Sequence, residues 1–478
     1  MKILVIGLDC ATPEILLADE RLVNIRRLMQ MGAFGRLESI IPPITVPAWM
    51  CMSTSLDPGS LGVYGFRNRT DRSYAGLGLV TSRSIQELAI WDQVAREGKR
   101  SVIIGVPPNF PPRKINGVSV GCFLTPSTVN DQYTAPAGLK DEIAALVGEY
   151  EVDVKGFRTD RKAWLRGEIF RMSRKYYQVV RHYLASTEWD YFHCVDIGLD
   201  RVQHGFWKYH DPRHVLHEPG SEFAEVIRDY YAHVDEEIGR ILELLTDDTV
   251  VLVVSDHGAQ RLDGGFCVNE WLVREKLLAL NEYPAAVTPF DQLSVDWGKT
   301  KVWSEGGYYA RVFFNVQGRE PNGTIAPADY EHFRDEIKAR LEATVPGTLV
   351  FKPEEVYRTV RNVAPDLIVH FGGLYYRSIG GVGYDTLTIV ENDTGPDDCN
   401  HAQFGSFILA ASNSPLHGEV TGARLLDIAP TLLELGGYDV PGSMQGRSLV
   451  TAGSAAPDLT ADQEQIIKDR LSGLGYIG

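Results

Sequence analysis

Carboxylate and imidazole side chains follow two short apolar segments of the chain. Asp9 comes directly after residues 2–8, and Asp256 and His257 come directly after residues 249–255. Apolar runs of this length are typical of buried strands, and in open α/β sheets ligands gather at the carboxyl ends of the strands. Aspartate and histidine at such places can hold a divalent metal ion.

A second group of the same residue types occurs elsewhere in the chain. Asp200 and His204 are four residues apart, so on a helix they share one face. His401 lies just before an apolar run at 405–411. Each residue alone has an ordinary structural explanation, such as a helix cap or an exposed pair, so the prediction depends on their joint occurrence. Three carboxylates and three imidazoles predict a pair of metal sites, with zinc favoured over manganese or iron.

A hydroxyl group precedes an apolar helix in the segment 41–50, which reads IPPITVPAWM. Thr45 lies there between a proline-rich approach and the expected helix start, where the helix dipole and free backbone N–H groups favour negative charge. Threonine becomes a nucleophile when coordination to a divalent metal lowers the pKa of its hydroxyl. In isolation Thr45 would be interpreted as an N-cap, and it becomes a candidate nucleophile only together with the predicted metal ligands.

Taken together, these motifs resemble the type I phosphodiesterase/nucleotide pyrophosphatase family of the alkaline phosphatase superfamily. The segments that carry the resemblance are ILVIGLD at 3–9, PPITVPAW at 42–49, LDRVQHGFW at 199–207, VVSDHG at 253–258, GREP at 318–321, APDL at 364–367, DIAPTLLELGG at 427–437 and LSGLGYIG at 471–478. The resemblance implies two metal ions, the first held by Asp9, Asp256 and His257 and also binding the Thr45 oxygen, the second held by Asp200, His204 and His401. It also favours Asp200 over Asp196, because Asp200 has the family's four-residue spacing to the histidine.

This resemblance implies a metal-dependent hydrolase of phosphoric diesters or pyrophosphates, with nucleotide-like substrates favoured. The reaction would proceed in two in-line steps through a phosphothreonine on Thr45. Alternatives on the same fold are a phosphomonoesterase and a transferase that passes a phosphoryl or phosphoglycosyl-type group to an acceptor alcohol. A binding protein without activity is disfavoured, because all six ligand positions and the nucleophile are filled.

Two departures from the family pattern bear on the substrate. Leu61 stands where relatives often have a histidine, and the phosphate-contacting asparagine of nucleotide-hydrolysing relatives has no clean counterpart. Arg67 and Asn68 are the candidates for that contact, and Trp49 either stacks on a planar substrate group or packs between helix and sheet. The apolar neighbours of Thr45 favour diesters, whereas Arg67 favours monoesters.

Alternating apolar runs and amphipathic segments predict the elements that would position these residues. Strand-like runs are followed by stretches in which apolar residues recur every three or four positions. This alternation favours an α/β fold with a mostly parallel sheet flanked by helices, and the resemblance implies an alkaline-phosphatase-like version of it. The expected strands are 2–8, 101–106, 190–195, 249–255, 366–370 and 405–411, and the expected helices are 161–188, 222–246 and 424–436.

Residues 258–400 interrupt the alternation with more glycine and proline. We interpret them as an inserted, smaller α+β subdomain in a catalytic core formed by residues 1–257 and 401–450. The tail at 451–478 is expected to pack on the core, with a short amphipathic helix at 459–473.

The composition limits the classes of partner. The net charge of −16 argues against long nucleic acid and anionic membranes, which bind basic surface, but not against a small phosphoester, because bound metals can reverse the local field. Six scattered cysteines without a C-x-x-C pair indicate a reducing compartment. With no secretory leader and no run of about 18 apolar residues, we expect a cytoplasmic protein, and the sequence leaves its oligomeric state open.

Overall fold

A ten-stranded sheet forms the centre of the computed structural model, which describes residues 1–412 and 414–452. Its strands are β1 (Lys2–Leu8), β2 (Ala33–Glu38), β5 (Ser101–Ile104), β6 (Gly117–Val120), β7 (Thr134–Ala135), β8 (Tyr191–Asp196), β9 (Thr249–Val254), β19 (Phe404–Ala410), β20 (Gly418–Glu419) and β21 (Ala423–Arg424). Their order is β20-β2-β19-β9-β1-β8-β5-β6-β7, and β21 also pairs with β2. The tail helix expected at 459–473 lies outside the described residues.

The middle of this sheet is parallel. Strands β9, β1, β8, β5 and β6 run in the same direction, and four of them are the apolar runs that the sequence predicted. Their side chains are buried on both faces, which explains why the runs are nearly continuous rather than alternating.

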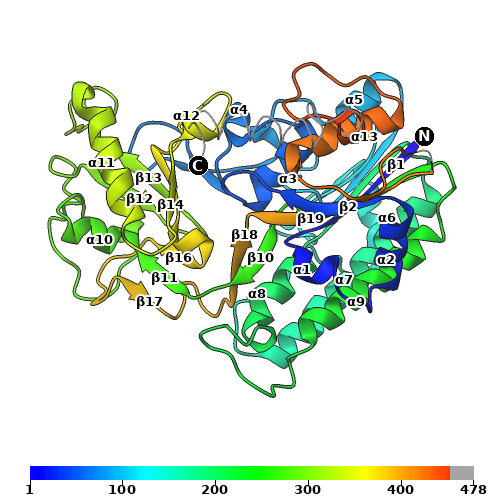
Figure 1. Cartoon of the computed structure of the whole chain (residues 1–478), viewed down its shortest axis with the longest axis horizontal. Helices are drawn as coiled ribbons and strands as arrows, with labels where there is room; N and C mark the ends of the chain where they lie inside the picture. The colour runs from blue at the N-terminus through cyan, green and yellow to red at the C-terminus, as the bar shows by residue number, and fades with distance from the viewer. Residues whose placement is uncertain (413, 453–478) are drawn as a thin grey trace, which may run out of the picture.

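Helices cover both faces of the sheet (Figure 1). On one face lie α1 (Pro13–Leu16), α2 (Val23–Met31), α7 (Lys162–Ser186), α8 (Gly198–His210) and α9 (Val226–Leu242), and on the other lie α3 (Thr45–Thr54), α5 (Ile90–Arg96) and α13 (Ile428–Gly436). Each layer has its own buried apolar cluster against the sheet. The predicted α/β class, with a mostly parallel sheet flanked by helices, is confirmed.

Two of the predicted runs are strands that do not join the parallel array. Strand β19 is antiparallel to both β9 and β2. Strand β15 (Leu367–His370) lies outside the main sheet, between antiparallel neighbours. Both segments are strands, as expected, but an apolar run indicates burial on both faces and carries no information on strand direction.

Most of residues 258–400 form smaller sheets with an apolar cluster of their own, seen beside the main sheet in Figure 1. Their elements are β10 (Gly258–Arg261), β11 (Gly264–Cys267), α10 (Val268–Arg274), β12 (Val302–Glu305), β13 (Ala310–Phe314), α11 (Tyr330–Glu342), β14 (Leu349–Phe351), α12 (Pro353–Val356), β15, β16 (Tyr376–Ile379), β17 (Thr388–Ile389) and β18 (Cys399–Ala402). Strands β10 and β18 pair antiparallel with each other, so the two ends of this segment meet next to the main sheet. The remaining elements are α4 (Pro58–Leu61), β3 (Arg67–Arg69), β4 (Leu77–Leu79), α6 (Leu139–Val147), α14 (Leu449–Ala452) and five short 3-10 helices.

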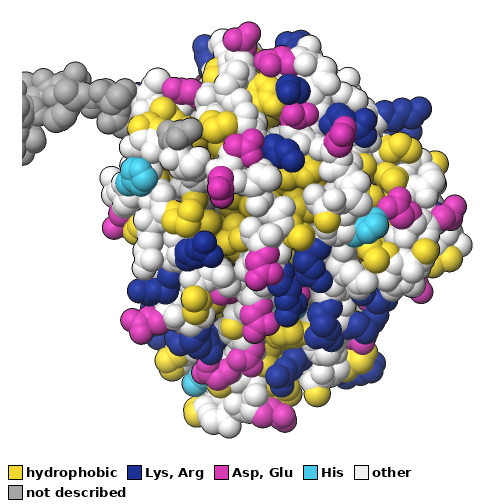
Figure 2. Space-filling view, turned by 90° about the vertical axis from the view of Figure 1, so that its right-hand side faces the viewer, with side chains coloured by type: hydrophobic (Ala, Val, Ile, Leu, Met, Phe, Trp, Pro, Cys, Tyr) yellow, Lys and Arg dark blue, Asp and Glu magenta, His cyan; other side chains and the backbone are white. Residues whose placement is uncertain are grey.

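Acidic and basic side chains are interspersed on the face of the molecule seen in Figure 2. Among the described residues, no helix combines the length and the apolar character that a membrane span requires.

Candidate metal centre

The first predicted ligand group assembles where two neighbouring strands end. Strands β1 and β9 are parallel, with Gly7 opposite Val254, so they finish at the same edge of the sheet. Asp9 follows β1, and Asp256 and His257 follow β9. All three side chains are buried, and one ligand atom from each lies within 4.8 Å of the others.

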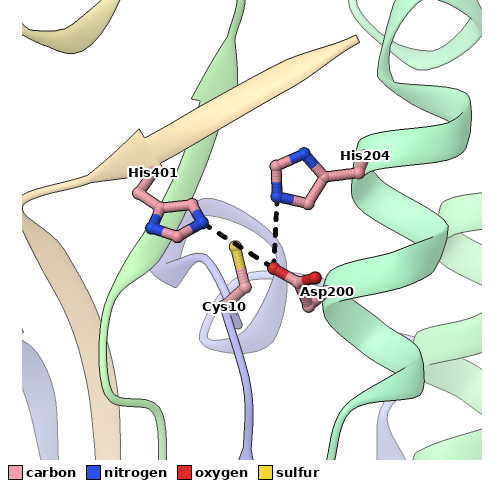
Figure 3. A group of neighbouring side chains, drawn as sticks. All are labelled: Cys10, Asp200, His204 and His401. Atoms are coloured by element: carbon pink, nitrogen blue, oxygen red, sulfur yellow. Dashed lines mark ion pairs between the residues drawn. The ribbon is translucent and has the colours of Figure 1, made fainter. Parts of the chain in front are cut away.

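The second group lies beside the first and draws on α8 and β18. Helix α8 places Asp200 and His204 one turn apart, and β18 contributes His401. His204 Nε2 lies 3.2 Å from Asp200 Oδ1, and His401 Nε2 lies 3.9 Å from the same oxygen (Figure 3). Cys10, the residue after Asp9, adds its Sγ to this group, and the four ligand atoms lie within 4.8 Å of one another.

Asp196, the other carboxylate near His204 in sequence, has a different environment. Its oxygens accept hydrogen bonds from the backbone N–H of Gly198 and from the hydroxyls of Tyr177 and Tyr230. Burial raises the pKa of Asp196 to about 6. These contacts bind Asp196 at the end of β8 to its protein neighbours, whereas Asp200 faces the histidines.

In each of the three histidines, Nδ1 forms a hydrogen bond to the protein and Nε2 faces the ligand groups. The Nδ1–H donates to Asp397 Oδ1 in His204 (2.6 Å), to the Gly258 carbonyl in His257 (3.1 Å) and to the Pro43 carbonyl in His401 (2.9 Å). With Nδ1 protonated, Nε2 is left with the lone pair that binds metals.

Several buried polar atoms of the two groups have no hydrogen-bond partner among the described residues. They are Oδ1 of Asp9, Oδ2 of Asp256 and Nε2 of His204. The other oxygens of the two carboxylates are tethered, since Trp49 Nε1 donates to Asp9 Oδ2 at 2.8 Å and the Cys10 N–H donates to Asp256 Oδ1 at 3.1 Å. Buried polar atoms without partners are costly, and cations bound between them would satisfy them. The residues present therefore fit a pair of divalent metal ions.

The electrostatics of the cluster lead to the same inference. Burial, followed by the charge of Asp200, raises the pKa of Asp9 well above its usual range, and burial together with Asp9 does the same for Asp256. Burial opposes ionisation of Asp200 as well, but His204 and Arg201 lower its pKa. Crowded buried carboxylates of this kind need positive charge nearby to ionise together.

Thr45 is the first residue of α3, and Ile44 occupies the N-cap position. The side chain is buried, and its Oγ1 lies 3.3 Å from Nε2 of His257. The alternative interpretation of Thr45 as an N-cap therefore does not apply. The hydroxyl instead lies between the helix N-terminus and the first ligand group.

Trp49 lies on the same helix but does not face an open surface. It is fully buried and its indole contacts Asp9 through the hydrogen bond described above. Gly7 makes this packing possible, because a Cβ at that position would lie 2.6 Å from the Trp49 ring. The position fits the packing alternative for Trp49 and leaves no exposed ring face for a substrate.

The other two substrate-binding candidates, Arg67 and Asn68, lie in β3. The Arg67 side chain is half-exposed and its guanidinium lies 3.8 Å from the carboxylate of Glu305. Asn68 accepts a hydrogen bond from the Tyr64 N–H. Within the described residues, neither side chain hydrogen-bonds to Thr45 or to a predicted ligand.

Three residues of the site were not predicted. Cys10 had a local signal, since it adjoins a candidate ligand at a strand end. Asp397 had none, because it is 193 residues from the His204 that it contacts. Tyr308, whose ring stacks on His401 with centroids 4.3 Å apart, lies in the segment between β12 and β13. Long-range partners of this kind have no spacing pattern in the sequence.

Comparison with solved structures shows the fold. Phosphonoacetate hydrolase from Sinorhizobium meliloti 1021, in complex with phosphonoacetate, is 16% identical, with a TM-score of 0.60 over 91% of this chain and 95% of that one. Murine ectonucleotide pyrophosphatase/phosphodiesterase 5, as an inactive variant in complex with AMP, is 13% identical, with a TM-score of 0.51 over 92% and 96% of the two chains. A search of curated proteins gave no significant match.

Comparison with family models shows the family. The model of the type I phosphodiesterase/nucleotide pyrophosphatase family matches residues 3–388, which is most of the chain and includes every predicted ligand except His401. The chain therefore belongs to the type I phosphodiesterase/nucleotide pyrophosphatase family, and it is a hydrolase that acts on phosphoric ester bonds.

Proposed function

We propose that this chain hydrolyses phosphoric diesters or pyrophosphates through a covalent phosphothreonine on Thr45, with two divalent metal ions in the two ligand groups. The observation that carries the proposal is the position of the Thr45 hydroxyl, buried at the N-terminus of α3 and 3.3 Å from a candidate ligand nitrogen. A helix N-terminus supplies backbone N–H groups without intrahelical partners, which suit a phosphate oxygen.

The chain's own residues have distinct tasks in this reaction. Asp9, Asp256 and His257 would hold the metal next to Thr45, and Asp200, His204 and His401 would hold the other. The bound ions would lower the pKa of the Thr45 hydroxyl and neutralise charge on the phosphate.

In the first step the Thr45 oxygen forms a bond to phosphorus, and the bond from phosphorus to the leaving oxygen breaks. In the second step water attacks phosphorus and the bond to Thr45 breaks. Two in-line displacements retain the configuration at phosphorus overall.

Zinc is the ion we propose for these groups, because carboxylate and imidazole ligands with buried surroundings suit it. We also propose a cytoplasmic location, which the six cysteines support, since all of them are buried and free. The substrates would be small phosphoesters. The ligands of the two structural neighbours, AMP and phosphonoacetate, guide the choice of compounds to test.

The test is hydrolysis of bis-p-nitrophenyl phosphate beside p-nitrophenyl phosphate and phosphonoacetate, with zinc or manganese added. Wild type is compared with Thr45→Ala, and with Thr54→Val as a matched control. The Thr54 hydroxyl is buried on the same helix but donates to the Met50 carbonyl.

Diester cleavage that is lost in Thr45→Ala and kept in Thr54→Val is the expected result. Near-full activity of Thr45→Ala would overturn the covalent route. Preference for p-nitrophenyl phosphate would overturn the diesterase assignment, and transfer to an added alcohol without hydrolysis would make the protein a transferase.

A further inference from the structure

We propose that Cys10 is a thiolate ligand of the second metal site, together with Asp200, His204 and His401, and that this site accordingly selects a thiophilic ion such as zinc over manganese or magnesium. The inference rests on the two-metal site of the proposed function. The inference adds a seventh candidate ligand to the six that the family resemblance implies, and it gives a reason for the identity of the ion.

The position of the sulfur carries the proposal. Cys10 follows β1, and its Sγ belongs to the cluster in which the four ligand atoms lie within 4.8 Å of one another. Figure 3 shows the thiol pointing between the Asp200 carboxylate and the His401 ring. The side chain is fully buried, so the sulfur faces this cluster and not solvent.

A second observation points to a ligand at the same place. His204 Nε2 is fully buried and has no hydrogen-bond partner among the described residues, while its Nδ1 is held by Asp397. With Nδ1 protonated, this nitrogen is an acceptor that faces another acceptor, Asp200 Oδ1, at 3.2 Å. An ion bound between it and the thiol would satisfy both atoms.

The backbone of Cys10 is fixed on both sides. Its N–H donates to Asp256 Oδ1, and its carbonyl accepts a hydrogen bond from Gln203 Nε2 at 2.7 Å. Its φ of 69° lies in the left-handed region, where a residue with a side chain is uncommon. Glycine would adopt this backbone conformation at lower energy than cysteine. The chain nevertheless has a cysteine here, and its thiol faces the cluster.

The chemistry of the donor set leads to the choice of ion. One sulfur, two imidazole nitrogens and one carboxylate oxygen are all zinc ligands, whereas manganese and magnesium prefer oxygen. On binding, the sulfur–metal bond replaces the S–H bond, and the proton leaves to solvent. Without the ion, the Cys10 thiol has a weak alternative partner in the Gly258 carbonyl, at 3.4 Å. Zinc can expand to five ligands, so a thiolate in the set still leaves room for a phosphate oxygen.

The experiment is a titration of metal-free protein with Co²⁺, followed by absorption spectroscopy. A cobalt–thiolate bond gives an intense charge-transfer band in the near ultraviolet that nitrogen and oxygen ligands do not give, so this measurement does not depend on activity. The variant is Cys10→Gly, which deletes the sulfur and suits the positive φ. The matched control is Cys267→Ala, another buried thiol that belongs to neither ligand group.

We expect two Co²⁺ per chain in wild type, with a charge-transfer band that is kept in Cys267→Ala and absent in Cys10→Gly. Competition titrations should show that Cys10→Gly lowers the zinc affinity of the second site by at least about tenfold. Loss of a residue that only hydrogen-bonds to a metal ligand already lowers metal affinity by about 10–100-fold. The affinity for manganese should change much less.

The outcomes separate the two proposals. Binding of two Co²⁺ without a charge-transfer band, or a band that persists in Cys10→Gly, would overturn the role of Cys10 and leave the two-metal site intact. Failure of wild type to bind two ions would overturn both proposals.

Discussion

The indole nitrogen of Trp49 donates a hydrogen bond to Oδ2 of Asp9 at 2.8 Å, while Oδ1 of the same carboxylate has no hydrogen-bond partner among the described residues. This contact links α3, which carries Thr45, to the end of β1. One oxygen of Asp9 is therefore held by the protein and the other is free for a metal. The candidate nucleophile and the candidate ligand thus depend on the same buried side chain for their relative position.

We expect Trp49→Phe to lower the metal affinity of the first site by about 10–100-fold, the usual effect of losing a residue that orients a ligand. Phenylalanine keeps most of the packing but cannot donate to Asp9. The measurement is a zinc titration of metal-free protein. Trp91→Phe is the control, because Trp91 is also buried but its Nε1 has no hydrogen-bond partner among the described residues. Equal losses of zinc affinity in Trp49→Phe and Trp91→Phe would show that the hydrogen bond from Trp49 to Asp9 does not contribute to metal binding.

The second site depends on Asp397 in a similar way. Its Oδ1 accepts the Nδ1–H of His204 at 2.6 Å, and its Oδ2 accepts hydrogen bonds from Arg158 and Arg377. These contacts hold the imidazole in the orientation and tautomer in which Nε2 can bind a metal.

We expect Asp397→Asn to weaken the second site by about 10–100-fold, because the amide carries no charge to support the imidazole. Calorimetric titration with zinc should resolve this as the selective loss of one of two binding events. The neighbouring Asp398→Asn serves as a control. Burial raises the pKa of Asp398 to about 7, and its Oδ2 has no hydrogen-bond partner among the described residues. If the first site weakens as much as the second, the role assigned to Asp397 is wrong.

The proximity of the candidate ligands could be predicted from sequence where a local motif meets a simple rule of topology. Asp9 and the Asp256–His257 pair each follow an apolar run, and the carboxyl ends of adjacent parallel strands lie together. Asp200 and His204 are one helical turn apart, so their spacing in the sequence was enough to predict that they share one face of the helix. These predictions needed no knowledge of the distant parts of the chain.

The rest of the site depends on contacts that local patterns do not encode. The partner of His204 is 193 residues away in sequence. The face of α3 that Trp49 occupies depends on Gly7 of β1, which leaves space for the ring. The direction of β19 could not be predicted for a related reason, since a strand buried on both faces has the same apolar pattern whichever way it runs.

The space at Gly7 provides a test of how tightly α3 is packed against the sheet. A Cβ there would lie 2.6 Å from the Trp49 ring and 2.8 Å from Val195. We expect Gly7→Ala to lower the free energy of unfolding by about 1–3 kcal/mol, the usual cost of overpacking. Gly167→Ala is the control, because Gly167 lies inside α7 and a Cβ there has open space. It should be neutral or stabilise by about 0.4–1 kcal/mol. Urea denaturation of both variants tests the prediction, which fails if Gly7→Ala is as stable as wild type.

Acid should destabilise the fold through histidines that are buried without charge. Burial lowers the pKa of His193 to about 3 and that of His370 to about 3, below the value of about 6.5 expected in the unfolded chain. The unfolded state therefore binds more protons than the folded state between these values, and the free energy of unfolding rises with pH from about 3 to 6.5. At pH 5 each of these histidines should lower the free energy of unfolding by roughly 2 kcal/mol relative to pH 8.

The measurement is the urea midpoint as a function of pH. We expect its pH dependence to become shallower in His370→Gln and to stay unchanged in the control His332→Gln, because His332 is an exposed residue of α11. An identical slope in wild type and His370→Gln would contradict the assignment of His370 as a buried neutral group.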